Sequence, residues 1–193
     1  MSDLRFTEIE HKYVVDEPFD VQRLRDVLSS LGPTRTSAVR VRDRYYLTEG
    51  GHARRFLIRH RYDTELHQLT LKALEDDTEA RTEITLDLGQ HAGSQEAAVD
   101  AFVERLGVIW RGTLHKDLEA WYFPDCEVVY YSAATEWRTV RCVEFEATRK
   151  DSFADALKIV ARFERATGFA GATRSHLSLP QMLFPGLQDA LRG

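Results

Sequence analysis

Charged residues recur at every second position in several short segments of this chain. They occur at Glu8, Glu10 and Lys12, at Arg59 and Arg61, at Lys72, at Arg81 and Glu83, and at Glu144 and Glu146. Carboxylate oxygens bind hard divalent cations, whereas arginine and lysine bind phosphate oxygens. A surface that presented both sets could hold a metal ion and a polyphosphate together.

Apolar residues occupy the alternate positions in the same segments, as in strands whose two faces differ. A half-buried sheet with its charges in water would show the same alternation. The grouping of the charges favours a different arrangement, because acids lie near both ends of the chain and bases lie between them. A surface that is merely soluble would intersperse the two signs, since like neighbours repel each other.

The elements that would position these charges are mostly short strands joined by turns. Strand-like alternation covers 5–15, 37–48, 53–62, 67–74, 81–88, 108–110, 114–123, 126–132 and 139–148. Helical spacing predicts amphipathic helices over 19–31, 94–107 and 152–168, and a shorter helical tail over 177–184. About eight antiparallel strands can close into a small barrel. A length of 193 residues fits one domain, so we predict a single domain over 1–193. Its fold class is α+β: an eight-stranded antiparallel closed β-barrel, a tunnel lined by the charged face, with surrounding helices.

The composition is that of an ordinary soluble globular protein. The 193 residues include 26 Lys and Arg against 31 Asp and Glu, a net charge of −5, which disfavours nucleic-acid binding through bulk positive charge. No segment approaches the ~20 apolar residues of a membrane span, and no signal peptide is visible. The two cysteines, Cys126 and Cys142, are too few for a structural zinc site and are expected to be small buried residues on neighbouring strands. We therefore expect a cytoplasmic protein with no membrane partner.

In their order and spacing, the charged segments resemble the motifs of the CYTH superfamily, the triphosphate tunnel metalloenzymes. Glu8-Ile-Glu10-His-Lys12 is similar to its ExExK motif, Asp43-Arg-Tyr45-Tyr46 to DxYY, Arg59-His-Arg61 to RxR, Leu69-Thr-Leu-Lys72 to LTxK, Arg81-Thr-Glu83 to RxE, Val143-Glu144-Phe-Glu146 to VExE, and Ser175-His-Leu-Ser-Leu to the closing SYxxL. The resemblance spans about residues 5–180.

The resemblance implies an eight-stranded tunnel that acts on triphosphate-containing small molecules with Mg²⁺ or Mn²⁺. It implies metal-binding roles for Glu8, Glu10, Glu144 and Glu146, and phosphate-binding roles for Lys12, Arg59, Arg61, Lys72, Arg81 and Lys116. It makes Lys72 and Glu83 the catalytic candidates, with Glu83 holding a second metal or orienting the water.

Three positions depart from the family pattern. Leu118 stands where a basic residue often follows Lys116, and Leu47 stands where an aspartate is common. The sixth strand offers only Glu127 as an acid, and at an awkward place. Fewer acids could mean one strongly held metal ion or an altered choice of substrate.

Three functions are compatible with these residues. The first is metal-dependent hydrolysis of inorganic tripolyphosphate, thiamine triphosphate or a nucleoside triphosphate, with release of phosphate. The second is cyclisation of ATP to cyclic AMP and pyrophosphate. The third is binding of a nucleotide or polyphosphate without catalysis. Pairing of two copies of the chain as a homodimer is left open.

Some residues of chemical interest have more than one interpretation. By alternation, His11 and His60 face away from the motif residues and are expected beneath covering helices. Arg40, Arg42 and Arg44 either extend the basic wall or form an exposed rim. The aromatic residues in 121–137 either pack in the core or stack on a ring of the substrate.

Overall fold

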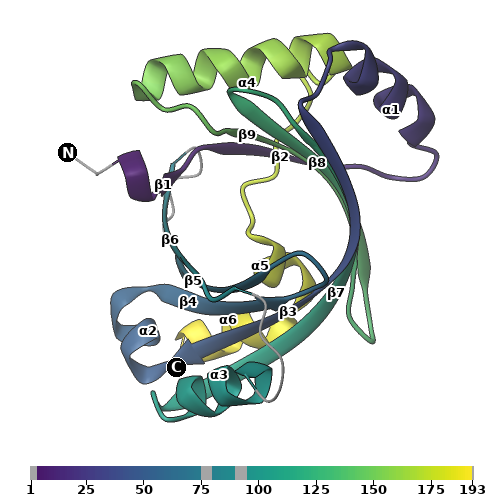
Figure 1. Cartoon of the computed structure of the whole chain (residues 1–193). Helices are drawn as coiled ribbons and strands as arrows, with labels where there is room; N and C mark the ends of the chain where they lie inside the picture. Colours follow the sequence, from purple (N-terminus) through teal and green to yellow (C-terminus); the bar gives the residue numbers. More distant parts are fainter. Residues whose placement is uncertain (1–3, 75–79, 90–94, 193) are drawn as a thin grey trace.

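The computed structural model describes residues 4–74, 80–89 and 95–192 (Figure 1). In chain order the elements are the 3₁₀ helix η1 (Leu4–Phe6), β1 (Thr7–Glu8), β2 (Glu10–Val14), α1 (Val21–Ser30), β3 (Arg35–Thr48), α2 (Glu49–Arg54), β4 (Phe56–Tyr62), β5 (His67–Ala73), β6 (Arg81–Asp87), α3 (Gln95–Glu104), β7 (Val108–Tyr122), β8 (Cys126–Ala134), β9 (Thr139–Ala147), α4 (Phe153–Thr167), α5 (Leu179–Leu183) and α6 (Pro185–Arg192).

The strands form one antiparallel sheet that closes into a barrel. Its order is β1-β6-β5-β4-β3-β7-β8-β9-β2, so β1 and β2 stand at its two ends. Only Ile9 separates β1 from β2 along the chain, and this short segment therefore pairs with β6 on one side and with β9 on the other. The predicted α+β barrel is confirmed. The described residues form nine strands instead of eight because the first strand is interrupted at Ile9.

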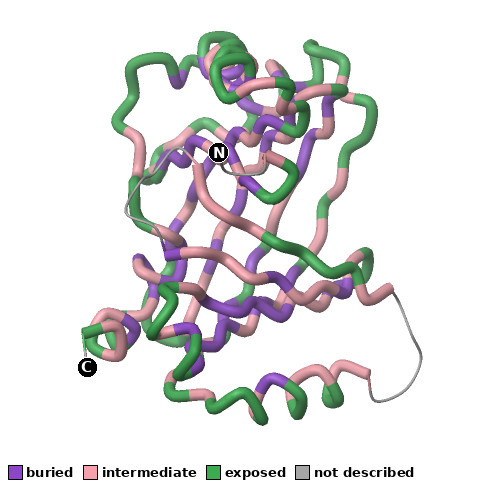
Figure 2. The backbone as a smooth tube through the Cα atoms, turned by 90° about the vertical axis from the view of Figure 1, so that its left-hand side faces the viewer, coloured by how far each residue is buried: buried purple, intermediate pink, exposed green. Residues whose placement is uncertain are grey.

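Helices cover the apolar outer face of the barrel. The helices α1 and α4 lie over β8, β9 and β2, whereas α3 lies beside β3 and β4 (Figure 1). Outward-facing Val143 and Phe145 of β9 pack in one core cluster with Val160 and Phe163 of α4. Figure 2 shows the buried residues concentrated along the strands, with exposed turns on the outer helices. This is the arrangement that the strand alternation predicted.

The C-terminal helices close one end of the barrel with apolar side chains. Leu179, Leu183 and Leu187 pack against Tyr45 and Leu57. The segment before α5 is fixed to the barrel, because the Ser175 backbone N–H donates to the Lys12 carbonyl oxygen at 2.8 Å. In addition, Arg138 Nη1 donates to the Met182 carbonyl oxygen at 2.8 Å. The interior is thus bounded at this end by α5, which we call the floor.

Several predicted boundaries differ from the structure. Helix α2 replaces the turn and the strand start predicted near 53, because the Thr48 side chain accepts a hydrogen bond from Gly51 and begins a helix. The strands predicted over 108–110 and 114–123 are one strand, β7. Gly112 does not break it; a Cβ there would lie 2.8 Å from the Trp110 ring and 2.9 Å from Phe184, so this glycine permits close packing. Helix α6 was not predicted. Position 94, the start of the helix predicted over 94–107, lies outside the described residues.

Two smaller expectations concern the cysteines and membranes. Cys126 and Cys142 are buried free thiols on the neighbouring strands β8 and β9, as predicted. None of the helices in the described ranges combines the length and apolar character needed to span a bilayer.

Candidate active site

The barrel encloses a cavity of about 340 Å³. Every residue predicted to bind metal or phosphate or to act in catalysis lines it: Glu8, Glu10, Lys12, Arg59, Arg61, Lys72, Arg81, Glu83, Lys116, Glu144 and Glu146. The charged face of the sheet therefore points inward. The roles of these residues in binding and catalysis remain predictions.

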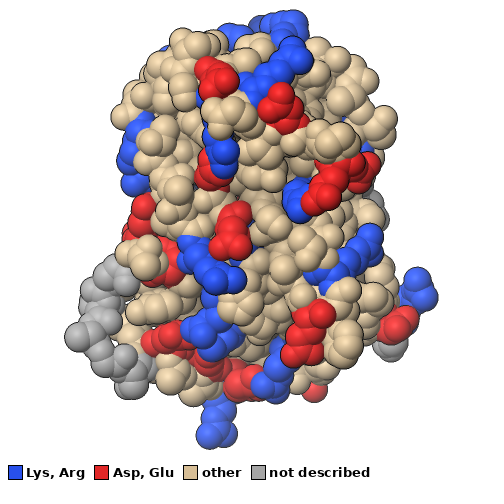
Figure 3. Space-filling model, turned by 90° about the vertical axis from the view of Figure 1, so that its right-hand side faces the viewer, with Lys and Arg blue, Asp and Glu red and all other residues tan. Residues whose placement is uncertain are grey.

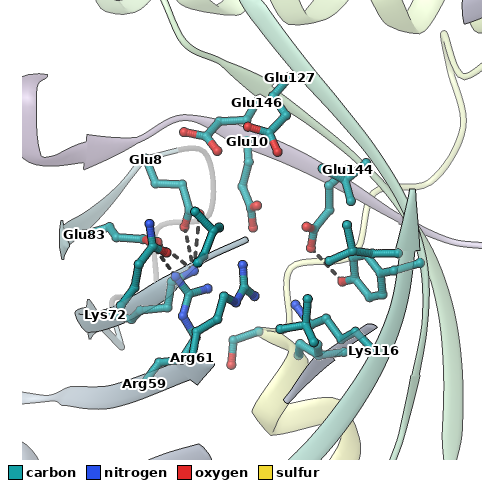
Figure 4. A pocket seen from close by; sticks show the side chains of 18 of the residues that line it. Glu8, Glu10, Arg59, Arg61, Lys72, Glu83, Lys116, Glu127, Glu144 and Glu146 are labelled. Atoms are coloured by element: carbon teal, nitrogen blue, oxygen red, sulfur yellow. Dashed lines mark hydrogen bonds and ion pairs between the residues drawn. The ribbon is translucent and has the colours of Figure 1, made fainter. Parts of the chain in front are cut away.

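Most of the acidic residues lie on one side of the cavity and most of the basic residues on the other, with Lys12 and Glu83 as exceptions (Figure 4). The acidic wall comes from β1, β2, β8 and β9 and consists of Glu8, Glu10, Glu127, Glu144 and Glu146. The basic wall comes from β4, β5 and β7 and consists of Arg59, Arg61, Lys72 and Lys116. On the outer face shown in Figure 3, by contrast, acidic and basic residues are interspersed. The interior thus separates the two signs of charge more than this outer face does.

Lys12 lies within the acidic wall and joins two of its strands. Its Nζ is 3.0 Å from Glu10 Oε1 and 3.0 Å from Glu144 Oε1. Burial acts to lower the pKa of Lys12, but the two carboxylates outweigh it and raise that pKa above its usual value. Burial acts to raise the pKa of Glu144; Lys12, Lys116 and a 2.7 Å hydrogen bond from the Tyr131 hydroxyl instead lower it to about 2. Glu144 is therefore a carboxylate with its charge already balanced.

Glu83 lies among the bases and is paired with two of them. Its Oε2 is 2.6 Å from Lys72 Nζ, and its Oε1 is 3.3 Å from Arg59 Nη2. These charges outweigh burial and hold the pKa of Glu83 well below its usual range. Lys72 also contacts Glu8 Oε1 at 3.2 Å and so bridges the two walls. Glu83 is consequently ionised and can accept hydrogen bonds but not donate a proton.

Asp43 positions two members of the basic wall. It is fully buried, and both of its oxygens accept 2.8 Å hydrogen bonds from Arg61. Lys116 Nζ lies 3.6 Å from Asp43 Oδ2 and 4.6 Å from the centre of the Tyr131 ring. Burial lowers the pKa of Lys116 to about 8. Sequence reasoning identified Asp43 only through its motif and missed this positioning contact.

Arg59 keeps one donor without a hydrogen-bond partner among the described residues. Its side chain is buried, and Nη2 donates to Thr70 Oγ1 at 3.2 Å, but Nε has no acceptor in this part of the chain. A buried unsatisfied donor costs about 1–3 kcal/mol, so the described side chains do not fully satisfy this guanidinium group, which lines the cavity. Arg59 thus fits the phosphate-binding role that was predicted for it.

The acidic wall has more carboxylates than cations to balance them. Burial raises the pKa of Glu146 to about 7; Lys150 opposes this effect, with its Nζ 3.6 Å away, and Glu10 adds to it. Burial and Glu10 likewise raise the pKa of Glu8 well above its usual value. A nearby cation would stabilise the charged form of such carboxylates and lower their pKa.

Glu127 belongs to this wall, which corrects the expectation that it lies at an awkward place. It lines the cavity and is the Cα partner of Glu146 across β8 and β9. Burial raises its pKa too. The signal was present in the sequence, because Glu127 is in phase with Val129 and Tyr131, which also line the cavity.

The carboxylate oxygens fit a hard divalent cation such as Mg²⁺ or Mn²⁺ in their chemistry. In the described ranges, no three side chains form a ready-made metal cage. Mg²⁺ commonly uses one or two carboxylates and completes its shell with water and substrate phosphate. Lys12 already pairs with Glu10 and Glu144. The carboxylates whose pKa burial raises despite their neighbours are those of Glu8, Glu127 and Glu146.

The residues predicted to face outward do so. His11 Nδ1 lies 2.5 Å from Glu164 of α4, and His60 Nδ1 lies 2.7 Å from Asp100 of α3. Both histidines are therefore beneath covering helices, as predicted. The alternative that Arg40, Arg42 and Arg44 extend the basic wall is wrong, since these three outward-facing residues pair with Asp117, Glu96 and Asp100.

The fold that encloses this cavity also occurs in other proteins of known structure. No family model and no curated protein sequence matches the chain. Among solved structures, the PH1012 protein of Pyrococcus horikoshii has a TM-score of 0.69 and 18% identity, over 91% of this chain and 99% of that chain. HpAC1 of Hippeastrum is described as an adenylyl cyclase candidate with a dominant triphosphatase activity. It has a TM-score of 0.57 and 14% identity, over 93% of this chain and 96% of that chain.

A similar fold also occurs in a protein that is described in another way. A chain of the Mediator head module of Schizosaccharomyces pombe matches with a TM-score of 0.54 and 12% identity, over 88% of this chain and 96% of that chain. At these identities the likeness concerns the fold alone. The barrel fold that the family resemblance implied is confirmed, and the activity has to be argued from the cavity.

Proposed function

We propose that this protein is a metal-dependent hydrolase that acts on triphosphate-containing small molecules and releases phosphate. The observation that carries the proposal is the opposition of a basic and an acidic wall across one cavity (Figure 4). A polyanion alone would satisfy one wall, and a cation alone would satisfy the other. A triphosphate together with a divalent cation matches both.

The basic wall binds and orients the phosphate groups. The guanidinium group of Arg59 lines the cavity, and Arg61 is held in place by Asp43. Guanidinium groups bind phosphate in a forked geometry, whereas Lys72 and Lys116 act as point charges. Phosphoryl transfer needs mainly positioning and stabilisation of developing charge, which such fixed donors supply.

The metal ion would be held by the acidic wall, with Glu8, Glu10, Glu144 and Glu146 as the predicted ligands and Glu127 as an addition. When bound, Mg²⁺ or Mn²⁺ supplies neutralising charge and Lewis acidity at the phosphate oxygens. The ionised Glu83 accepts a hydrogen bond from the attacking water and orients it. Lys72, between Glu8 and Glu83, neutralises charge that develops on the transferred phosphoryl group.

The dominant triphosphatase activity of HpAC1 supports hydrolysis over cyclisation as the first candidate. The test is incubation of the purified protein with tripolyphosphate, thiamine triphosphate and ATP, each with and without Mg²⁺ or Mn²⁺. Metal-dependent phosphate release is the expected result. Formation of cyclic AMP would identify a cyclase instead, and tight binding without turnover would identify a binding protein. The same assay on Arg59→Ala, which should lose activity, links the reaction to this cavity.

A further inference from the structure

A single row of residues runs around the open rim of the cavity, away from the floor. Arg35 is the Cα partner of Tyr122, Tyr122 of Glu127, Glu127 of Glu146, and Glu146 of Glu10. The Arg35 side chain is 58% exposed, whereas that of Lys116, deeper in the cavity, is 9% exposed. The row therefore connects the acidic wall directly to an Arg–Tyr pair at the rim.

In this Arg–Tyr pair the guanidinium group lies over the aromatic ring. The guanidinium carbon of Arg35 lies over the Tyr122 ring, 4.1 Å from its centre. Glu65 holds the arginine from the side at 3.8 Å, and Ser37 donates to Glu65 at 2.8 Å. An exposed guanidinium group beside a tyrosine ring provides cationic and aromatic surface on which a planar ring of a ligand can stack.

Apolar side chains continue this surface inward. Val39, Leu66, Leu118, Tyr122 and Val129 all line the cavity and are partly exposed; we call them the apolar collar. Val39 and Leu118 are Cα partners on β3 and β7, and Val129 lies on the neighbouring strand β8. The collar thus lies between the ionic centre and the rim.

Such a collar does not suit a purely inorganic substrate. Inorganic tripolyphosphate is charged along its whole length and gains nothing from apolar surface, whereas an organic ring gains about 25 cal/mol for each Å² of apolar area that it buries. Leu118 is informative here, because it stands where the family resemblance would place a basic residue. Leu118 adds apolar surface to the cavity at this position.

The floor fixes the direction in which such a substrate lies. Leu179 and Pro180 of α5 are buried and form part of the cavity lining at the closed end. A bulky organic group therefore has room only at the rim, with the phosphates directed towards Arg59 and Lys116.

We propose that the substrate is a triphosphate ester with a planar aromatic organic group, which binds against the apolar collar and the Arg35–Tyr122 pair. This inference rests on the proposed function and narrows its substrate class. Two sources of such a group are a nucleoside triphosphate and thiamine triphosphate. They share the planar ring and the triphosphate, and separate assays distinguish them.

The test compares kcat/KM for ATP, thiamine triphosphate and inorganic tripolyphosphate in the same buffer with Mg²⁺. We expect the unmodified protein to prefer at least one ester over tripolyphosphate. In Arg35→Gln and in Leu118→Arg, the ratio of kcat/KM for that ester to kcat/KM for tripolyphosphate should fall at least fivefold. Arg40→Gln is the matched control, because it removes the same charge from the outward face of the same strand; its ratio should change less than twofold.

Two results would overturn the inference. One is that the unmodified protein uses tripolyphosphate at least as well as both esters. The other is that Arg35→Gln and Arg40→Gln change the ratio equally. If none of the three compounds is hydrolysed, the proposed function fails. The inference is then tested separately by calorimetric Kd values for the same compounds and variants. The ratio of the Kd for tripolyphosphate to the Kd for the ester takes the place of the kcat/KM ratio.

Discussion

The carboxylates of the acidic wall differ in how their charge is balanced. Glu144 has Lys12 and a tyrosine hydroxyl as partners, and its pKa falls to about 2. Glu146 is near the rim, and its pKa rises to about 7. Two glutamates two positions apart on β9 therefore differ: the surroundings of Glu144 favour its charged form, whereas those of Glu146 favour its neutral form.

We predict that Glu146→Gln stabilises the metal-free protein and abolishes metal-dependent turnover. A carboxyl group whose pKa is raised on folding, here from 4.5 to about 7, contributes stability below pH 4.5 and loses that contribution as the pH rises through 7. The variant should therefore be more stable by about 1 kcal/mol at pH 8, a gain limited by solvent screening, and should show little gain at pH 4. Urea denaturation at the two pH values measures this. Wild-type turnover at saturating Mg²⁺ would show that Glu146 is not a metal ligand.

We predict that Arg59→Ala lowers kcat/KM by about 10²–10³-fold, the usual loss when one donor to a transition state is removed. Arg59→Lys should recover only part of it, because a lysine cannot reproduce the forked geometry. Steady-state kinetics measure both, with Arg40→Gln as the control at an outward-facing position. An unchanged kcat/KM in Arg59→Ala would remove this residue from the site.

At the scale of elements, the strands orient the charges and α5 sets the depth of the cavity. Leu183 of α5 is buried among the apolar residues of the floor, whereas Leu177, just before α5, is 48% exposed. Leu183→Ala should lower the free energy of unfolding by about 2–5 kcal/mol, as large-to-small changes in a core do. Leu177→Ala should change it by less than about 0.5 kcal/mol. Equal effects in urea denaturation would contradict the assignment of α5 as a packed floor.

The sequence predicted the strands and the inward direction of their charges well, because alternation of period two is a strictly local signal. It placed His11 beneath a helix for the same reason. The floor could not be predicted, since it depends on which distant strands Leu183 and Leu187 contact. The course of β7 through Gly112 was missed because a glycine usually weakens a strand, and only the nearby Phe184 ring explains its presence. Glu127 was undervalued because its importance comes from its cross-strand partner, Glu146.

At the scale of the whole molecule, the two walls make the ligand-free barrel electrostatically incomplete. We predict that tripolyphosphate and Mg²⁺ together raise the melting temperature more than the sum of their separate effects. At a ligand concentration of 100 Kd the stabilisation is about 2.7 kcal/mol, or roughly 5–10 °C for a protein of this size. Differential scanning fluorimetry measures this, and 0.5 M NaCl should reduce the shift. The absence of any shift with either ligand would contradict binding in the cavity.

The segment around Ile9 also has a consequence for how the protein is made. Its strands β1 and β2 leave the ribosome before any other described strand, yet β2 pairs with β9, which is synthesised more than a hundred residues later. Pairings so distant along the chain form slowly, and strand edges that wait for a partner invite aggregation. Of the described strands, β2 is therefore among the first to be translated and among the last to pair, and a chaperone that shields β2 until β9 has emerged should raise the yield of folded protein.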